Sequence, residues 1–228
     1  MAASSVLGGC ADIGAPPAFV EVSGDAFSFG PGASGRIAGA SVRILEDGDL
    51  STQTDADGHF AVDGLVAGDR ASFIFEAEGY PVVQTKTFTI DGELERVTFQ
   101  VPSDEVYDLL ATVVSVEPDP ARCQLVSTVT RIGKSVYDEG AHGVADVIVT
   151  LDPPVDAESG PIYFNASVIP DRSLTMTSED GGVLFVNVPP GTYTMRATKD
   201  GMNFEEITME CRAGVVVNAS PPYGLQAY

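Results

Sequence analysis

Residues 54–68, which read TDADGHFAVDGLVAG, decide the fold because they return as residues 177–191, TSEDGGVLFVNVPPG. Each copy contains an Asp-Gly pair, at residues 57–58 and 180–181. Such pairs are typical of hairpin turns, because glycine adopts positive φ and aspartate hydrogen-bonds its own backbone. Apolar residues follow each turn at matching positions: Phe60, Val62 and Leu65 in the first copy, Val183, Phe185 and Val188 in the second. Their alternation predicts β-strands.

The repeat extends to both sides of these turns. Upstream, residues 37–44 and 144–151 alternate small or apolar residues with polar ones, and downstream each copy has a strand pattern that ends at Gly79 or Gly201. A chain of 228 residues is long enough for one large or two ordinary domains. The repeat favours two, and the Gly-rich, Pro-rich composition without tryptophan is typical of an all-β protein.

Two segments lie outside the repeat. The first is a short helix with Ser103 as N-cap, whose apolar stripe must dock on a sheet or at the domain boundary because so short a helix is marginal alone. The stripe consists of Val106, Leu109, Leu110, Val113 and Val114. The second is an insertion, residues 152–176, where a function private to the second copy would be placed. The expected division is a leader and tether over 1–17, a sandwich over 18–102, a helix and linker over 103–120, and a second sandwich over 121–228.

The charge is strongly acidic, with 12 basic and 33 acidic residues and a net charge of −21. This balance opposes binding to nucleic acid and to anionic lipid surfaces. No stretch approaches the ~20 apolar residues of a membrane helix. We therefore expect a monomer with no nucleic-acid partner and with membrane contact only through a lipid anchor.

Residues 2–10, AASSVLGGC, resemble the end of a bacterial lipoprotein signal, in which leucine and small residues precede a lipidated cysteine. The basic region and most of the apolar region of such a signal are missing. Either the start codon is placed too late or the resemblance is accidental, and the tether-like residues after Cys10 favour the first. Lipidation at Cys10 predicts an exported protein of the bacterial cell envelope, an outer-membrane lipoprotein facing the periplasm or the surface.

The cysteine count also bears on export. If Cys10 carries lipid, Cys123 and Cys211 remain as a pair that flanks the second repeat. The alternative is two unconnected buried thiols. Export favours a disulfide, which requires Cα atoms within ~7 Å of each other.

The first copy combines turn glycines, an aspartate and inward-facing apolar residues in one pattern: Gly39, Ala40, Val42, Ile44, Thr54, Asp55, Gly58, Phe60, Leu65, Gly68, Gly79 and Tyr80. In these residues the repeat resembles the carboxypeptidase regulatory-like domain. The second copy keeps Asp180, Gly181, Val188, Pro189, Pro190, Gly191, Tyr193 and Gly201, and departs at Asp146, Ser178 and Val183. The resemblance implies two transthyretin-like, antiparallel β-sandwiches, a fold that serves as stalk, spacer or binding module on many exported proteins.

The sequence shows no constellation that predicts a catalytic, metal or cofactor site. The two histidines, His59 and His142, fall in predicted loops, and no zinc-type spacing is present. Acidic residues gather between residues 46 and 57, but a predicted strand separates the two acidic turns by ~14 Å, too far for one calcium ion. Transthyretin-like hydrolases end in Tyr-Arg-Gly-Ser, which the C-terminus lacks.

We therefore expect a non-enzymatic structural or binding module, a spacer or interaction unit, whose partner is another envelope protein or a glycan. The alternative is a carbohydrate-binding module with contacts from Tyr163, Phe164 and Tyr223, although the first two alternate along a strand so that only one would be exposed. A transthyretin-like hydrolase is the third and weakest hypothesis.

Overall fold

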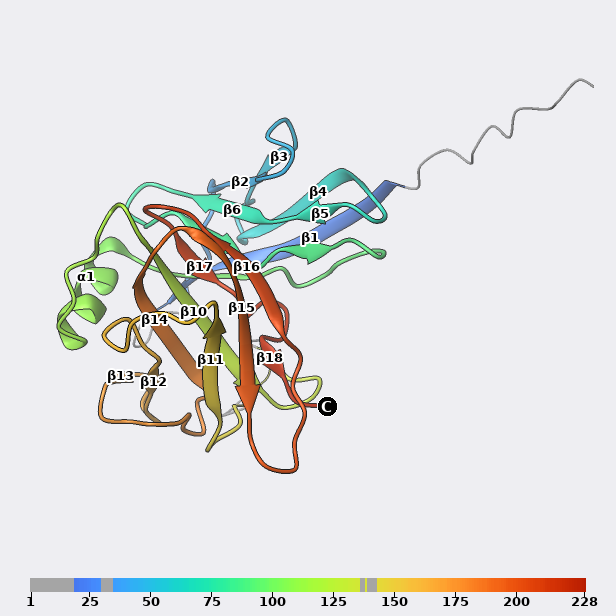
Figure 1. The fold of residues 1–228 in the computed structure, drawn as a ribbon. Coiled ribbons are helices and arrows are strands. Elements are labelled where there is room, and N and C mark those ends of the chain that lie inside the picture. Colours follow the sequence, from blue (N-terminus) through green and yellow to red (C-terminus); the bar gives the residue numbers. More distant parts are fainter. Residues whose placement is uncertain (1–18, 30–34, 136–137, 139–142) are drawn as a thin grey trace, which may run out of the picture.

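The protein is described by a computed structural model that covers residues 19–29, 35–135, 138 and 143–228. Figure 1 shows a predominantly β fold with one helix among these residues. The N-terminal half contains β1 (Phe19–Phe29), β2 (Ser41–Ile44), β3 (Ser51–Gln53), β4 (His59–Val66), β5 (Arg70–Ala71), β6 (Phe73–Glu76), β7 (Val83–Thr85), β8 (Phe88–Thr89) and β9 (Phe99–Pro102). The helix α1 (Asp104–Val113) follows. The C-terminal half contains β10 (Cys123–Thr130), β11 (Ile148–Asp152), β12 (Ile162–Phe164), β13 (Pro170–Asp171), β14 (Gly182–Val188), β15 (Gly191–Thr198), β16 (Ile207–Cys211), β17 (Val216–Asn218) and β18 (Leu225–Gln226).

The two halves repeat the same strand pairing. β1 pairs antiparallel with β4, and β10 pairs antiparallel with β14. Both pairs contain an irregularity at the same place, between Val20 and Val22 in one half and between Cys123 and Leu125 in the other. β1 also pairs in parallel with β9, and β10 with β17 and β18. The predicted sandwich-like all-β fold is confirmed, but its sheets are mixed rather than purely antiparallel.

A threonine holds the start of the repeat in each half. The hydroxyl of Thr54 donates to the Ile37 carbonyl oxygen at 2.7 Å and accepts from the Ala40 N–H at 2.9 Å. In the second copy, the buried Thr177 hydroxyl likewise donates to the Val144 carbonyl at 2.6 Å and accepts from the Val147 N–H at 3.0 Å. The first residue of the repeated stretch is therefore a buried clamp between two chain segments.

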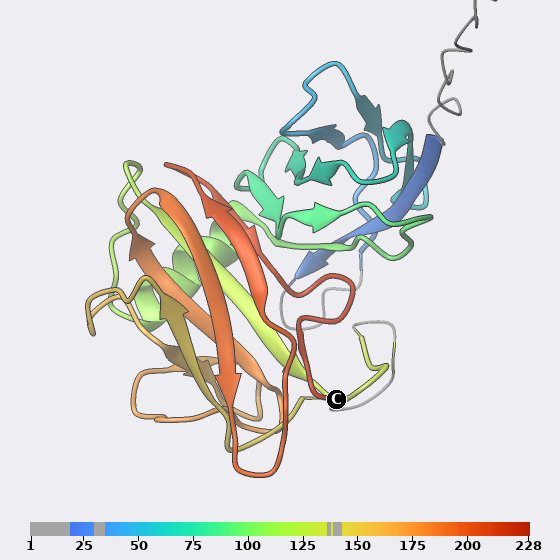
Figure 2. The same ribbon diagram turned by 45° about the vertical axis from the view of Figure 1, so that its right-hand side comes forward.

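Each half has its own hydrophobic core. In the N-terminal half, the rings of Phe60 and Phe75 both pack against Phe99, with centroids 5.8 and 5.5 Å away. In the C-terminal half, a separate cluster surrounds Leu125, Phe185 and Met195. Figure 2 shows the halves as two lobes side by side.

A single sheet of ten strands runs through both lobes. Its main path is β13-β12-β14-β10-β17-β7-β6-β2-β3, so the halves join where β17 pairs in parallel with β7. Val216 lies opposite Val83 in this pairing, and Asn218 lies opposite Thr85. The remaining strands form the smaller sheets β4-β1-β9, β11-β15-β16 and β5-β8.

The predicted disulfide is confirmed. Cys123, at the start of β10, is bonded to Cys211, at the end of β16, and their Cα atoms are 5.7 Å apart. Because β10 and β16 belong to different sheets, the bond ties the two layers of the C-terminal half together.

The helix begins as expected but presents a different face. The Ser103 hydroxyl accepts from the Val106 N–H, which confirms the predicted N-cap. Two of the five residues of the predicted stripe do not face the protein, because Leu109 and Val113 are 59% and 46% exposed. The face turned toward the protein consists of Tyr107, Leu110, Ala111 and Val114. Their spacing of three and four residues places them on one side of the helix. Leu109 and Val113 point away from that side.

Candidate binding cleft

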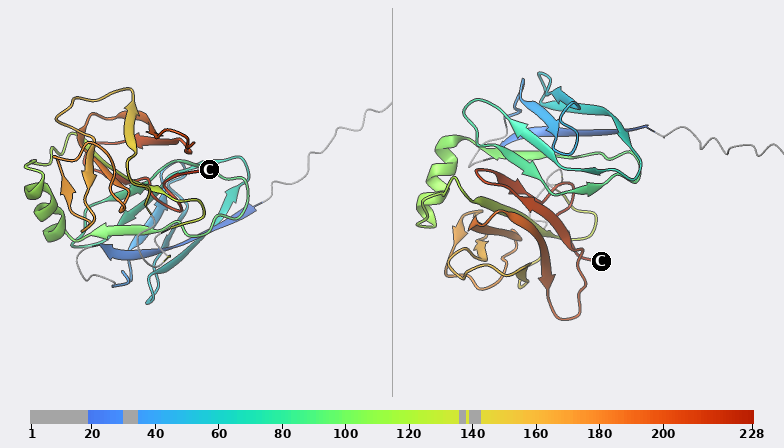
Figure 3. Two further views of the ribbon diagram at one scale, coloured as in Figure 1. Left: turned by 90° about the horizontal axis from the view of Figure 1, so that it is seen from below. Right: turned by 45° about the horizontal axis from the view of Figure 1, so that its top comes forward.

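A cleft lies where α1 and the ends of two N-terminal strands face the sheet of the C-terminal half. Strands β12, β14, β10 and β17 form its floor, α1 covers it, and the ends of β1 and β9 close one side. Figure 3 shows α1 at the margin of both lobes. The cavity has a volume of about 470 Å³.

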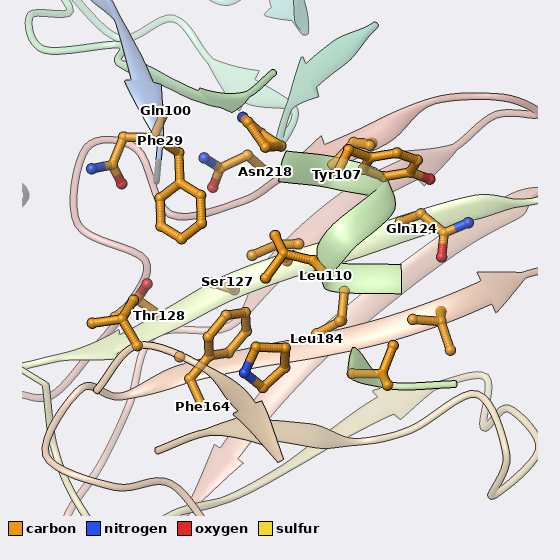
Figure 4. A pocket seen from close by; sticks show the side chains of 18 of the residues that line it. Phe29, Gln100, Tyr107, Leu110, Gln124, Ser127, Thr128, Phe164, Leu184 and Asn218 are labelled. Carbon is orange, nitrogen blue, oxygen red and sulfur yellow. The ribbon is translucent and has the colours of Figure 1, made fainter. Parts of the chain in front are cut away.

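The inner part of the cleft is apolar. Phe164, Leu184 and Val186 belong to a small cluster of buried residues on the outer face of the sheet, against which Val126 also packs. This cluster explains why the sequence of β14 is an almost unbroken apolar run. Val183 and Phe185 face the core of the C-terminal half, whereas Leu184 and Val186 face the cleft. Side chains from α1 complete the enclosure, and Figure 4 shows Leu110 near the middle.

One edge of the cleft is polar. The hydroxyls of Thr128 and Ser220 are hydrogen-bonded at 3.1 Å, and the Ser220 N–H donates to the Asn218 side-chain oxygen at 3.0 Å. Glu179 and Asp180 lie at the same edge, because the next residues lead into β14 opposite Thr128. Both charged residues that line the described cleft are acidic, and no lysine or arginine lines it.

The two segments outside the repeat meet here. The insertion supplies Phe164 and Val168 to the lining, and its Arg172 Nε donates to the carbonyl oxygen of Val114 at the end of α1, at 2.8 Å. Val168 and Ser115 have φ angles of 61° and 57°. Positive φ is unusual for any residue with a side chain and most unusual for a β-branched one, so both connections beside the cleft hold strained backbone.

Asn187 fixes the linker that leads from α1 into β10. Its side-chain oxygen accepts from the Asp119 N–H at 2.9 Å and from Gln124 Nε2 at 3.1 Å, and its amide nitrogen donates to the Glu117 carbonyl at 3.0 Å.

Burial raises the pKa of Tyr107 in the cleft, and nearby Asp108 raises it further. The Tyr107 hydroxyl therefore stays protonated in the ordinary pH range.

The aromatic residues expected to contact a glycan are not exposed side by side. Tyr163 is 1% exposed in the core of the C-terminal half, and its hydroxyl accepts from the Val149 N–H at 3.0 Å. Phe164, 7% exposed, lines the cleft, and Tyr223 is half-buried. The expectation that one of the first two would be exposed is wrong, because both faces of this sheet are covered. Cys10 and His142 lie outside the described residues.

A second group of polar residues surrounds the first Asp-Gly turn. Asp25 is buried, and one of its carboxylate oxygens contacts both Arg36 Nη1, at 2.7 Å, and His59 Nδ1. Asp55 accepts from the His59 and Asp57 N–H groups, and the first of these hydrogen bonds is the main factor that lowers the pKa of Asp55. These contacts tie β1 to the turn before β4, and we assign them a structural role.

The residues that the structure describes contain neither a metal-binding cluster nor a membrane-spanning helix. No group of three His, Cys, Asp or Glu side chains there could hold a metal ion. Within the same residues, no helix has the length and apolarity needed to cross a membrane.

The cleft residues that the sequence did not single out include Tyr107, Ala111 and Thr128. Two signals pointed toward them: an unpartnered helix stripe, and a strand at residues 182–188 without polar alternation. Together these features indicate a helix on the outer face of that strand.

No family model matches the chain, and no curated protein matches it. Among solved structures, the TIE protein of Bacillus anthracis matches with 17% identity and a TM-score of 0.30. The match covers 88% of this chain but only 33% of the TIE protein. The minor pilin GBS52 of Streptococcus agalactiae matches with 10% identity and a TM-score of 0.27, over 88% of this chain and 93% of the pilin. A cohesin–dockerin complex from Acetivibrio cellulolyticus matches with 12% identity and a TM-score of 0.32, over 51% of this chain and 81% of that one.

Proposed function

We propose that the protein is a non-enzymatic structural module of the bacterial cell surface, in which two β-sandwich domains act as one rigid unit. The observation that carries this proposal is the parallel pairing of β7 with β17, which makes one sheet out of strands from both halves. Two domains joined only by a linker would move independently. Shared backbone hydrogen bonds instead favour a fixed distance and angle between the two ends, as a spacer requires.

Side chains reinforce this junction. Gln84 is fully buried; its Nε2 donates to the Glu210 carbonyl at 2.9 Å, and its Oε1 accepts from Arg212 Nε at 2.9 Å. The Thr87 N–H donates to the Thr208 carbonyl oxygen at 3.3 Å. Separation of the halves would replace these hydrogen bonds by bonds to water, and each of them opposes separation by about 0.5–1.5 kcal/mol.

The proposal includes the domain boundaries, 18–102 and 121–228, and attachment to the cell envelope through a lipid on Cys10. The partner would be another envelope protein. The net charge of −21 supports solubility and weak non-specific contact with anionic surfaces.

Small-angle X-ray scattering on the protein without its N-terminal tether tests the rigid unit. We expect the scattering profile of the structure, and a larger maximum dimension for a variant with Gln84→Ala and Arg212→Ala. The control is Arg43→Ala, which removes a surface ion pair with Glu76 away from the junction. Scattering that shows the two lobes moving independently in the unmodified protein would refute the proposal.

Mass spectrometry of the native membrane fraction tests the lipid anchor on Cys10. A mature chain that retains residues 1–9 and carries no acyl mass would exclude this anchor.

A further inference from the structure

The size of the cleft fits a small molecule. Its volume is about 470 Å³. That volume falls in the range of small-molecule sites, ~300–1,000 Å³. Moreover, α1 and the insertion, the two segments that the repeat does not explain, both contribute to it.

The lining indicates an amphipathic ligand. Beneath α1, Leu110 and Val114 face Leu184 and Val186, and no charged residue lies in this part of the described lining. One edge is polar, with the Thr128–Ser220 hydroxyl pair and the adjoining Asn218, whereas the Gln124 amide on the other side of the cleft is hydrogen-bonded to Asn187. Figure 4 shows Asn218 grouped with Phe29 and Gln100, apart from Leu184.

The charges at the polar edge indicate the sign of the head group. Glu179 is exposed there, while no basic side chain lines the described cleft. The overall net charge of −21 adds to this negative potential. An anionic head would be repelled, and a cationic head would be attracted.

We propose that the cleft binds a small amphipathic molecule with an apolar body and a cationic head. The apolar body lies between α1 and the outer face of β14 and β10, and the head lies near Glu179 and the Thr128–Ser220 pair. This site is independent of the proposed role as a spacer.

A fluorescent probe and three competitors with the same chain test the proposal. The uncharged probe N-phenyl-1-naphthylamine should brighten when the folded protein is added. Dodecylamine should displace it at a concentration at least tenfold below that of dodecanoate, with dodecanol between them, and the difference should shrink in high salt. Absence of probe binding, or equal displacement by the amine and the carboxylate, would overturn the proposal.

Matched variants locate the site. Ala111→Phe fills the cleft from α1 and should abolish probe binding, whereas Leu109→Phe adds a ring to the exposed face of the same helix and should not. Glu179→Gln should reduce the preference for dodecylamine over dodecanol, whereas Glu78→Gln, which removes an exposed charge outside the cleft, should leave it unchanged. Circular dichroism of Ala111→Phe controls for folding. Undiminished binding by folded Ala111→Phe, or an unchanged head-group preference in Glu179→Gln, would refute the assignment.

Discussion

At the scale of single residues, both halves depend on the same threonine contact. Thr54 and Thr177 are 4% and 3% exposed, and each hydroxyl satisfies one backbone carbonyl and one backbone N–H. Replacement of either residue by valine keeps the shape but leaves two buried backbone groups without partners. We expect each variant to lose about 2–3 kcal/mol of unfolding free energy. Urea unfolding measures the loss, and Thr150→Val, on the exposed side of β11, should change it by less than ~0.5 kcal/mol.

Asp146 shows how the second copy departs from the first. It occupies the position of Gly39: the N–H groups of these residues donate to the carbonyls of Thr177 and Thr54, and their φ angles are 59° and 70°. The position requires left-handed backbone, which glycine adopts freely and aspartate tolerates.

Gly39→Ala should therefore cost about 1 kcal/mol, because no neighbouring atom would contact the added methyl group and only the φ angle opposes it. Gly92→Ala, which also has open space but no positive φ, is the matched control. Equal unfolding midpoints for the two variants in thermal melts would contradict this explanation.

At the scale of elements, the disulfide distinguishes the halves. The bond closes a loop with a sequence separation of 88 residues, which corresponds to roughly 4 kcal/mol on the chain-entropy model. The double variant Cys123→Ala, Cys211→Ala should lose much of that stability in the C-terminal half. Hydrogen exchange should show earlier loss of protection in β10 and β16 than in β1 and β4. A uniform loss across both halves would show that they unfold as one cooperative unit.

The elements also show what could be predicted from the sequence. Residues 59–63 of β4 alternate because one face meets the core. The turn before this strand, its apolar positions and the matching features of the second copy were predictable from local patterns. The parallel pairing of β7 with β17 joins residues more than 130 positions apart, Val83 and Val216, and no local pattern encodes it. Only one side of the cleft, closed by the ends of β1 and β9, depends on that junction. The meeting of α1 with the outer face of β14 was indicated by the helix stripe and by the apolar run over residues 182–188.

At the scale of the whole molecule, the junction between the halves contains a cation that burial disfavours. Lys86 follows β7, and its ammonium group lies 5.5 Å from the centre of the Phe88 ring. Desolvation lowers the pKa of Lys86 to about 8, and the charge of Glu205 in the C-terminal half opposes this shift only in part. The protonated form of Lys86 is therefore a source of instability in the folded protein.

The direction in which stability changes with pH follows from the pKa of Lys86 in the folded protein and in the unfolded chain. The ordinary pKa of 10.5 applies in the unfolded chain, so between pH 8 and 10.5 the unfolded chain binds more protons than the folded protein. The contribution of Lys86 to stability should therefore increase as the pH rises through this window, and stay level below it. Lys86→Met should be more stable than the unmodified protein at pH 7, and the difference should shrink at pH 9.5. Urea unfolding at both pH values measures this change, with the surface variant Lys134→Met as control. Parallel pH profiles for the unmodified protein and Lys86→Met would show that the ammonium group of Lys86 is solvated in the folded state.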